Sequence, residues 1–160
     1  MRGLYLFAAG ILFGLVVQMA IAQNQSRGVV GLNHVAISVP DIDEAVTYYT
    51  ETMGFPEAFR TVDENGQTAL VYVQVSATTF VELQPANAER SPGINHIGVH
   101  VEDMAAVTTM FRERGANVTA TRVGSTNSIL ANVYDPNGIR IELLELPPES
   151  LPARAMERWK

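Results

Sequence analysis

The 160-residue sequence contains no cysteine, which excludes disulfide bonds, thiolate metal ligands and cysteine nucleophiles. Basic residues are also few, because eleven Lys and Arg stand against seventeen Asp and Glu, for a net charge of −6. Nucleic-acid binding depends on positive charge that contacts phosphates, so we expect no nucleic-acid partner. Histidine is scarce as well, and imidazole chemistry falls on His34, His96 or His100.

The first 22 residues have the pattern of a targeting segment. Residues 1–22 contain one basic residue, Arg2, then an apolar stretch, then a small-x-small end. This pattern predicts a secretory signal peptide, whose cleavage would leave an exported protein in the periplasm or outside the cell, free of the membrane. The alternative is a retained anchor, because the segment is just long enough to cross a bilayer of about 30 Å.

The remainder of the chain contains one module written twice. GLNHVAISV recurs as GINHIGVHV at an offset of 62 residues, and FVEL is matched by RIEL at an offset of 60. Agreement at nearly constant spacing indicates an internal duplication. We therefore divide the chain after the signal peptide into a linker, one two-module domain and a Pro-rich C-terminal tail, at residues 23–30, 31–146 (modules 31–85 and 93–146) and 147–160.

Each module predicts the order strand, helix, strand, strand, strand. Period-two alternation marks the first strand, Asp41 or Asp43 is a candidate N-cap for the helix that follows, and turn signals separate the later strands. The fold class is therefore α+β, with two tandem βαβββ modules whose sheets form a half-barrel around a cleft. We further expect an edge strand at 117–121, and a short helix around 153–159 packed on the outside.

Alternation also predicts which side chains face the cleft. His34 and His96 point away from the Val and Ile residues that pack against the helices, and Glu82 and Glu142 do the same on the last strand of each module. Two imidazoles and two carboxylates at equivalent positions would converge, and a divalent cation would neutralise the carboxylates. The sequence therefore predicts one ion of Ni, Co, Zn, Fe or Mn in this cleft.

Other residues share the facing expected of the pocket wall. These candidate substrate-binding residues would make a pocket that is apolar and aromatic with few positive charges, which disfavours phosphorylated or CoA substrates. They are Ser38, Tyr72, Gln74, His100, Asn132 and Tyr134.

Four segments resemble the vicinal oxygen chelate superfamily, which contains glyoxalase I, extradiol dioxygenases, methylmalonyl-CoA epimerase and antibiotic-resistance proteins. They read LNHVAISVPDIDEAVTYYTETMGF, FVELQP, INHIGVHVED and VYDPNGIRIELLE. The resemblance runs from about residue 31 to residue 145. It implies paired βαβββ modules around one divalent metal, with His34, Glu82, His96 and Glu142 at the ligand positions.

The filled ligand positions are similar to those of glyoxalase I, which implies a metal-dependent lyase or isomerase with Glu142 as the base. Glyoxalase I usually has an Arg four residues after the first His to hold glutathione, and this chain has Ser38 there, which argues against glutathione. In methylmalonyl-CoA epimerase a second catalytic Glu would fall near Ala69, which argues against that activity. An extradiol-type dioxygenase and a metal-free binding protein of the resistance type are the alternatives. The partner is then a small-molecule substrate, with a homodimer left open.

Overall fold

The protein is described here from a computed structural model that covers residues 28–159. The predicted signal peptide at residues 1–22 lies outside the described residues, as does most of the predicted linker. Within residues 28–159, no helix is long and apolar enough to cross a membrane.

The first module has the predicted order of elements. Of the two candidate N-caps, Asp41 begins the first helix, and its side chain accepts hydrogen bonds from the backbone N–H groups of Asp43 and Glu44. The helix continues directly into one turn of π-helix and ends before Gly54, whose φ is +74°. The elements are β1 (Val29–Val39), α2 (Ile42–Thr47), η1 (Tyr48–Thr52), β2 (Glu57–Val62), β3 (Thr68–Gln74) and β4 (Phe80–Pro85).

The second module repeats this order with a shorter edge strand. The predicted strand at 117–121 is wrong, because this stretch makes only an isolated bridge at Val118. The hydroxyl of Thr119 accepts the backbone N–H of Asn132 at 2.9 Å and so takes the place of a main-chain partner in the ladder. The elements are β5 (Gly93–Val101), α3 (Met104–Glu113), β6 (Arg122–Val123), β7 (Ile129–Tyr134) and β8 (Arg140–Glu145).

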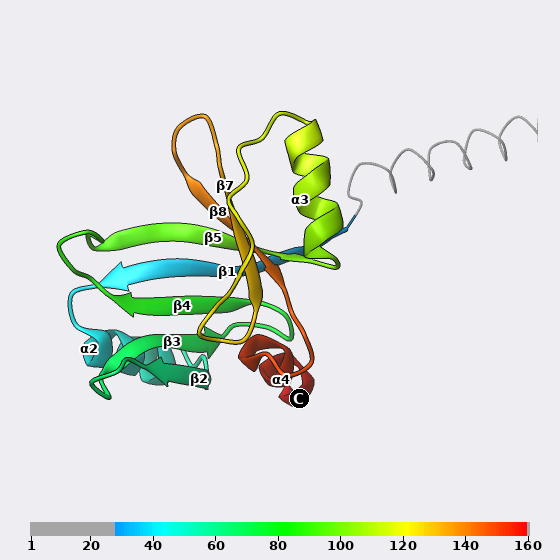
Figure 1. Ribbon diagram of the computed structural model, residues 1–160. Coiled ribbons are helices and arrows are strands. Elements are labelled where there is room, and N and C mark those ends of the chain that lie inside the picture. Colours follow the sequence, from blue (N-terminus) through cyan, green and yellow to red (C-terminus); the bar gives the residue numbers. More distant parts are fainter. Residues whose placement is uncertain (1–27, 160) are drawn as a thin grey trace, which may run out of the picture.

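All eight strands belong to one curved sheet (Figure 1). The strand order is β2-β3-β4-β1-β5-β8-β7-β6, so the two modules join where β1 pairs antiparallel with β5. In each module the first strand also pairs parallel with the last, β1 with β4 and β5 with β8. The predicted half-barrel and α+β class are confirmed, with one continuous sheet in place of two separate ones.

The helices α2 and α3, which follow the first strand of each module, cover the same face of the sheet. Val71, Val73 and Leu83 form the buried core beneath α2, and Val107 of α3 packs in a second core with Leu143. Because neighbouring residues on a strand point to opposite faces, the residues between these core positions face the other, concave side.

The C-terminal helix α4 (Leu151–Arg158) lies on that concave side, so the prediction that it packs on the outside is wrong. Its Ala155 is 1% exposed and shares a buried cluster with Tyr72 and Phe80. Tyr72 stands between Val71 and Val73 on β3, which face α2, so α2 and α4 lie on opposite faces of the sheet. The tail thus closes one end of the concave surface.

Candidate metal centre

The two central strands bring both histidines of the repeat together. His34 on β1 lies opposite Gly98 on β5, and His96 on β5 lies opposite Ala36 on β1. This register places the imidazoles diagonally across the junction of the modules, with their Nε2 atoms 3.0 Å apart. Both side chains are almost completely buried. The pseudo-symmetric axis of the duplication therefore runs between the two rings.

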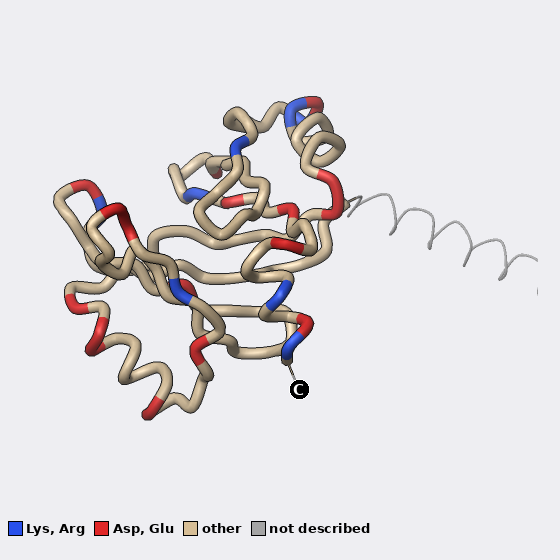
Figure 2. Tube along the Cα trace, turned by 60° about the horizontal axis from the view of Figure 1, so that its bottom comes forward, with Lys and Arg blue, Asp and Glu red and all other residues tan. Residues whose placement is uncertain are grey.

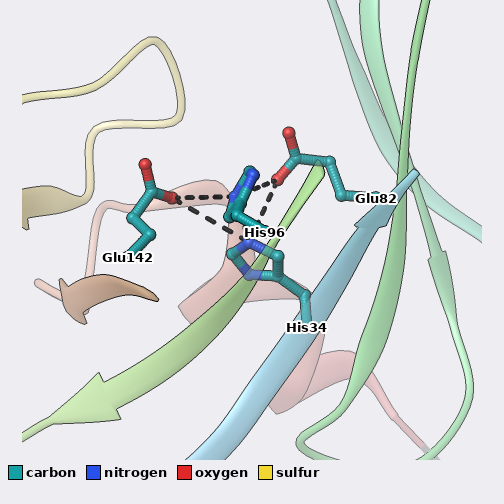
Figure 3. Close-up of side chains that lie close together, drawn as sticks. All are labelled: His34, Glu82, His96 and Glu142. Atoms are coloured by element: carbon teal, nitrogen blue, oxygen red, sulfur yellow. Dashed lines mark hydrogen bonds and ion pairs between the residues drawn. The ribbon is translucent and has the colours of Figure 1, made fainter. Parts of the chain in front are cut away.

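The two carboxylates enter from the strands that flank this pair. On β4, Glu82 lies beside Ala36, and on β8, Glu142 lies beside Gly98. Glu82 Oε2 is 3.2 Å from His34 Nε2 and 3.9 Å from His96 Nε2. Glu142 Oε2 is 3.6 Å from His96 Nε2 and 3.9 Å from His34 Nε2. All four side chains point toward one another (Figure 3).

Each histidine is oriented by the asparagine that precedes it. His34 Nδ1 donates to Asn33 Oδ1 at 3.1 Å, and His96 Nδ1 lies 2.8 Å from Asn95 Oδ1. Arg140 donates to the same Asn95 oxygen. On His34, a proton on Nδ1 leaves the lone pair of Nε2 directed at the centre, which is the arrangement that metal-binding histidines use. His96 Nδ1 also lies 2.5 Å from an Arg140 nitrogen, so a second side chain orients this ring. The repeated Asn-His dipeptide thus supplies both a ligand and the group that orients it.

The protonation states of the centre follow from burial and from the neighbouring charges. Burial lowers the pKa of His34, with partial opposition from Glu82, so the ring is neutral at pH 7. Burial raises the pKa of Glu142, but His96, His34 and Arg140 together outweigh it and hold the pKa below its usual value. Burial, together with the Glu82 charge, raises the pKa of Tyr72, whose hydroxyl therefore keeps its proton.

The donor set fits a divalent cation. The four ligand atoms lie within 4.8 Å of one another, and all four residues are buried. Metal–ligand bonds of about 2.0–2.2 Å place two ligand atoms at most about 4.4 Å apart, so small movements of these side chains bring all four ligand atoms to one ion. Two carboxylates brought together in a buried pocket are costly without positive charge between them, and a divalent cation supplies that charge. The site is therefore chemically suited to one ion bound by His34, Glu82, His96 and Glu142.

We expect the protein to bind about one divalent ion per chain, with a rise in melting temperature that EDTA reverses. A ligand present at a hundred times its dissociation constant stabilises the folded state by about 2.7 kcal/mol. Elemental analysis and differential scanning fluorimetry after soaking in Ni²⁺, Co²⁺ or Zn²⁺ measure both effects. The His96→Ala protein should lose both the bound ion and the rise in melting temperature. The His100→Ala protein, which lacks the same kind of side chain on the same strand, should keep both. Equal loss of the ion in both variants would contradict this assignment.

The pocket over the centre is small, about 240 Å³, and more cationic than the sequence predicted. Its lining includes Arg90, Arg122 and Arg140 beside the carboxylates of Glu82 and Glu142. Acidic positions are otherwise spread over both modules (Figure 2). The prediction of few positive charges is wrong, because these side chains converge from separate elements. The charge argument against phosphorylated or CoA substrates therefore does not hold.

Of the six predicted wall residues, Tyr72 lines this pocket and the others lie elsewhere. Ser38 is buried beside Asn95, whose side-chain amide donates to its hydroxyl at 3.4 Å. His100 and Gln74 line two separate hollows against α4. On β7, Asn132 and Tyr134 lie beyond Leu130, which is the β7 residue that reaches the pocket. The curvature of the sheet explains why these predictions failed. Two residues that face the same side of a curved sheet can still lie over different hollows.

Several pocket residues were missed from the sequence. Gln84 and Arg140 lie two residues from Glu82 and Glu142 on the same strands, so alternation alone could have found them. Arg122 lies on a two-residue strand after an irregular stretch, where alternation gives no signal. The importance of Gly98 was also missed. A Cβ built on this residue would lie 2.1 Å from the His34 ring, so a side chain here would displace the imidazole.

Comparison with known proteins agrees with this geometry. The sequence profile of the Glyoxalase/Bleomycin resistance protein/Dioxygenase superfamily matches residues 31–143. An ethylmalonyl-CoA/methylmalonyl-CoA epimerase of Cereibacter sphaeroides is 32% identical over 128 residues, which cover 70% of this chain and 95% of that protein. A lactoylglutathione lyase of Salmonella typhimurium is 27% identical over 123 residues, with 71% and 91% covered.

The fold has equally clear counterparts among solved structures. The crystal structure of methylmalonyl-CoA epimerase from Mycobacterium tuberculosis superposes with a TM-score of 0.68 at 26% identity, and the match covers 78% of this chain and 93% of that one.

Proposed function

Because the chain belongs to the glyoxalase/bleomycin resistance protein/dioxygenase superfamily, we propose that it is a metal-dependent isomerase or lyase that moves a proton between adjacent carbons of a small substrate. The observation that carries the proposal is the buried group of two imidazoles and two carboxylates, with ligand atoms within 4.8 Å of one another. Relatives named as an epimerase and a lyase support an enzyme of this kind.

The proton transfer falls to Glu142. A divalent ion at the centre would act as a Lewis acid on the substrate oxygens. Glu142 accepts a proton from the hydroxyl-bearing carbon beside the substrate carbonyl and returns it to the carbonyl carbon, while the hydroxyl proton passes to the former carbonyl oxygen. The substrate is therefore isomerised without an external oxidant. Its lowered pKa keeps the carboxylate ionised at neutral pH and ready to accept the proton.

The pocket suits a substrate, or a carrier thiol, that bears an anionic group. The volume of about 240 Å³ admits a small molecule, and Arg122 stands at its rim with a side chain 53% exposed. Guanidinium groups recognise carboxylates and phosphates through paired hydrogen bonds. Ser38 adds nothing to this recognition, since it is buried and does not line the pocket.

Epimerisation of a CoA thioester is the second candidate, favoured by the identity of 32% to the Cereibacter sphaeroides protein. Inversion of a carbon requires proton donors on both of its faces. Near Ala69, where the second carboxylate of an epimerase would fall, β3 contributes Leu70 to the pocket. Among the described residues, the carboxylates that line the pocket are Glu82 and Glu142. Epimerisation would therefore require both of these residues to transfer protons.

The proposal also includes export, so that the enzyme would work in the periplasm or outside the cell. It is supported by the charged start, apolar stretch and small-x-small end of residues 1–22. Immunoblotting of cell fractions with an antibody against the folded domain tests this part separately.

Proton NMR in D₂O tests the function. The Ni²⁺-, Co²⁺- or Zn²⁺-loaded protein is mixed with methylglyoxal hemithioacetals of glutathione or 2-mercaptoethanol and with methylmalonyl-CoA, and the Fe²⁺- or Mn²⁺-loaded protein is mixed with catechol under air. We expect metal-dependent isomerisation of a hemithioacetal. Inversion of methylmalonyl-CoA would favour the second candidate, and ring opening of catechol would show a dioxygenase. Binding by calorimetry without turnover of any probe would overturn the proposal in favour of a binding protein.

A further inference from the structure

The two carboxylates of the centre occupy equivalent places in the repeat but are held very differently. Both oxygens of Glu82 accept hydrogen bonds from buried or half-buried side chains. The Tyr72 hydroxyl donates to Oε2 at 2.5 Å, and the Gln84 amide donates to Oε1. Oε2 is also the oxygen nearest to His34 Nε2, at 3.2 Å, so Tyr72 binds the oxygen that faces the centre.

Tyr72 is itself fixed by its surroundings. Its side chain is 2% exposed, and its ring stacks on Phe59 with centroids 4.6 Å apart and an interplanar angle of 21°. Phe80 packs edge-on at 5.6 Å, and Ala155 of α4 closes the same cluster. A tightly packed ring has no alternative rotamer at low cost, so its hydroxyl stays directed at Glu82.

Within residues 28–159, no buried side chain from outside the centre donates a hydrogen bond to Glu142, which is held by His96 and paired with Arg122. Its outward oxygen, Oε1, lies 3.5 Å from Arg122 NH2, and the Arg122 side chain is 53% exposed on the two-residue edge strand β6. An ion pair with an exposed side chain contributes little and is readily exchanged for water or for another anion. Glu142 can therefore move toward a substrate, and Arg122 can turn to an anionic group of that substrate.

We propose that Tyr72 is a positioning residue that, with Gln84, fixes Glu82 as a permanent ligand and leaves Glu142 as the single mobile base. This rests on the proposed function. One base takes a proton from one face of the substrate and returns it on that face, which suits transfer to the neighbouring carbon. Inversion needs a second donor on the other face, and the fixed Glu82 does not provide it. The duplication thus supplies two equivalent carboxylates, and the tyrosine makes them different.

The test compares Tyr72→Phe with Tyr49→Phe. The first variant keeps the packed ring and removes the hydroxyl that donates to Glu82 and also lies 3.3 Å from His34 Nδ1. The second removes a hydroxyl on the opposite, α2-facing side of the same module. The Gln84 variant described below changes a contact of Glu82 alone. Co²⁺ titration of each protein gives an affinity and a visible absorption spectrum without any substrate. We expect Tyr72→Phe to bind Co²⁺ about 10- to 100-fold more weakly with altered bands, as loss of a partner to a ligand does, and Tyr49→Phe to match the wild type.

A second variant, Gln84→Met, should weaken Co²⁺ binding in the same direction, which guards against an effect peculiar to the tyrosine. A lowered melting temperature of Tyr72→Phe with unchanged affinity and spectrum would overturn the proposal, because the hydroxyl would then be merely structural. If the wild type turns over a hemithioacetal, Tyr72→Phe should also give measurable inversion of methylmalonyl-CoA. If no probe reacts with the wild type, the proposed function fails while the Co²⁺ result still decides the role of Tyr72.

Discussion

Replacing Glu142 with glutamine should lower the rate of proton transfer by about 10²- to 10⁴-fold while the fold persists, since this is the usual contribution of a general base. The amide has nearly the shape of the carboxylate but cannot accept the proton. The variant should also bind metal more weakly, so rates must be compared at saturating Ni²⁺ or Co²⁺. The NMR assay in D₂O measures the loss directly.

Two other substitutions make the Glu142 result specific. Glu102→Gln removes the same charge from an exposed position outside the pocket and should leave the rate unchanged. Glu82→Gln should weaken metal binding but lose much less of the rate once the metal is saturating, because Glu82 serves as a ligand. Equal losses of rate at Glu82 and Glu142 would contradict the assignment of distinct roles, and a fully active Glu142→Gln enzyme would exclude this residue as the base.

Gly98→Ala should abolish tight metal binding although the change adds only one methyl group. The new Cβ would lie 2.1 Å from Cε1 and 2.3 Å from Nδ1 of His34, so the imidazole must leave its place or β1 must separate from β5. Forced overpacking costs about 1–3 kcal/mol, and the displaced ring no longer completes the ligand set. We expect a melting temperature several degrees lower and little or no metal by elemental analysis.

Gly31→Ala is the matched control for this substitution. Gly31 lies on the partner strand β1, has no atom within 4 Å of its would-be Cβ, and has no positive φ. The Gly31→Ala protein should therefore keep both the metal content and the melting temperature of the wild type. Wild-type metal content in Gly98→Ala would show that His34 can bind from another position, and the site geometry described above would then be wrong.

The four candidate ligands could be predicted from the sequence because each depends only on strand alternation and on the repeat. His34 and Glu82 share a facing within the first module, and the duplication assigns the same facing to His96 and Glu142. Both patterns are local, and the register of β1 with β5 then brings the four together. The role of these residues as metal ligands stays a prediction until metal is measured.

Features that depend on the path of the chain in space could not be predicted. The amphipathic tail helix could be recognised, but its pattern does not say which face of the sheet it covers. Arg122 reaches the pocket only because an irregular stretch carries it across the edge of the sheet. The need for glycine at 98 is equally hidden, since the equivalent position in the first module is Ala36, which lies beside His96 in the same buried centre.

The position of α4 links this helix to the candidate metal centre. Ala155 packs on the ring of Tyr72, whose hydroxyl holds a candidate ligand, yet α4 lies beyond the residues that the family profile matches. Any free energy by which docking of this helix favours metal binding must, by thermodynamic reciprocity, be returned as tighter docking when the metal is bound. Packing at α4, which lies outside the four ligand strands, would therefore alter the affinity of the centre for a metal ion.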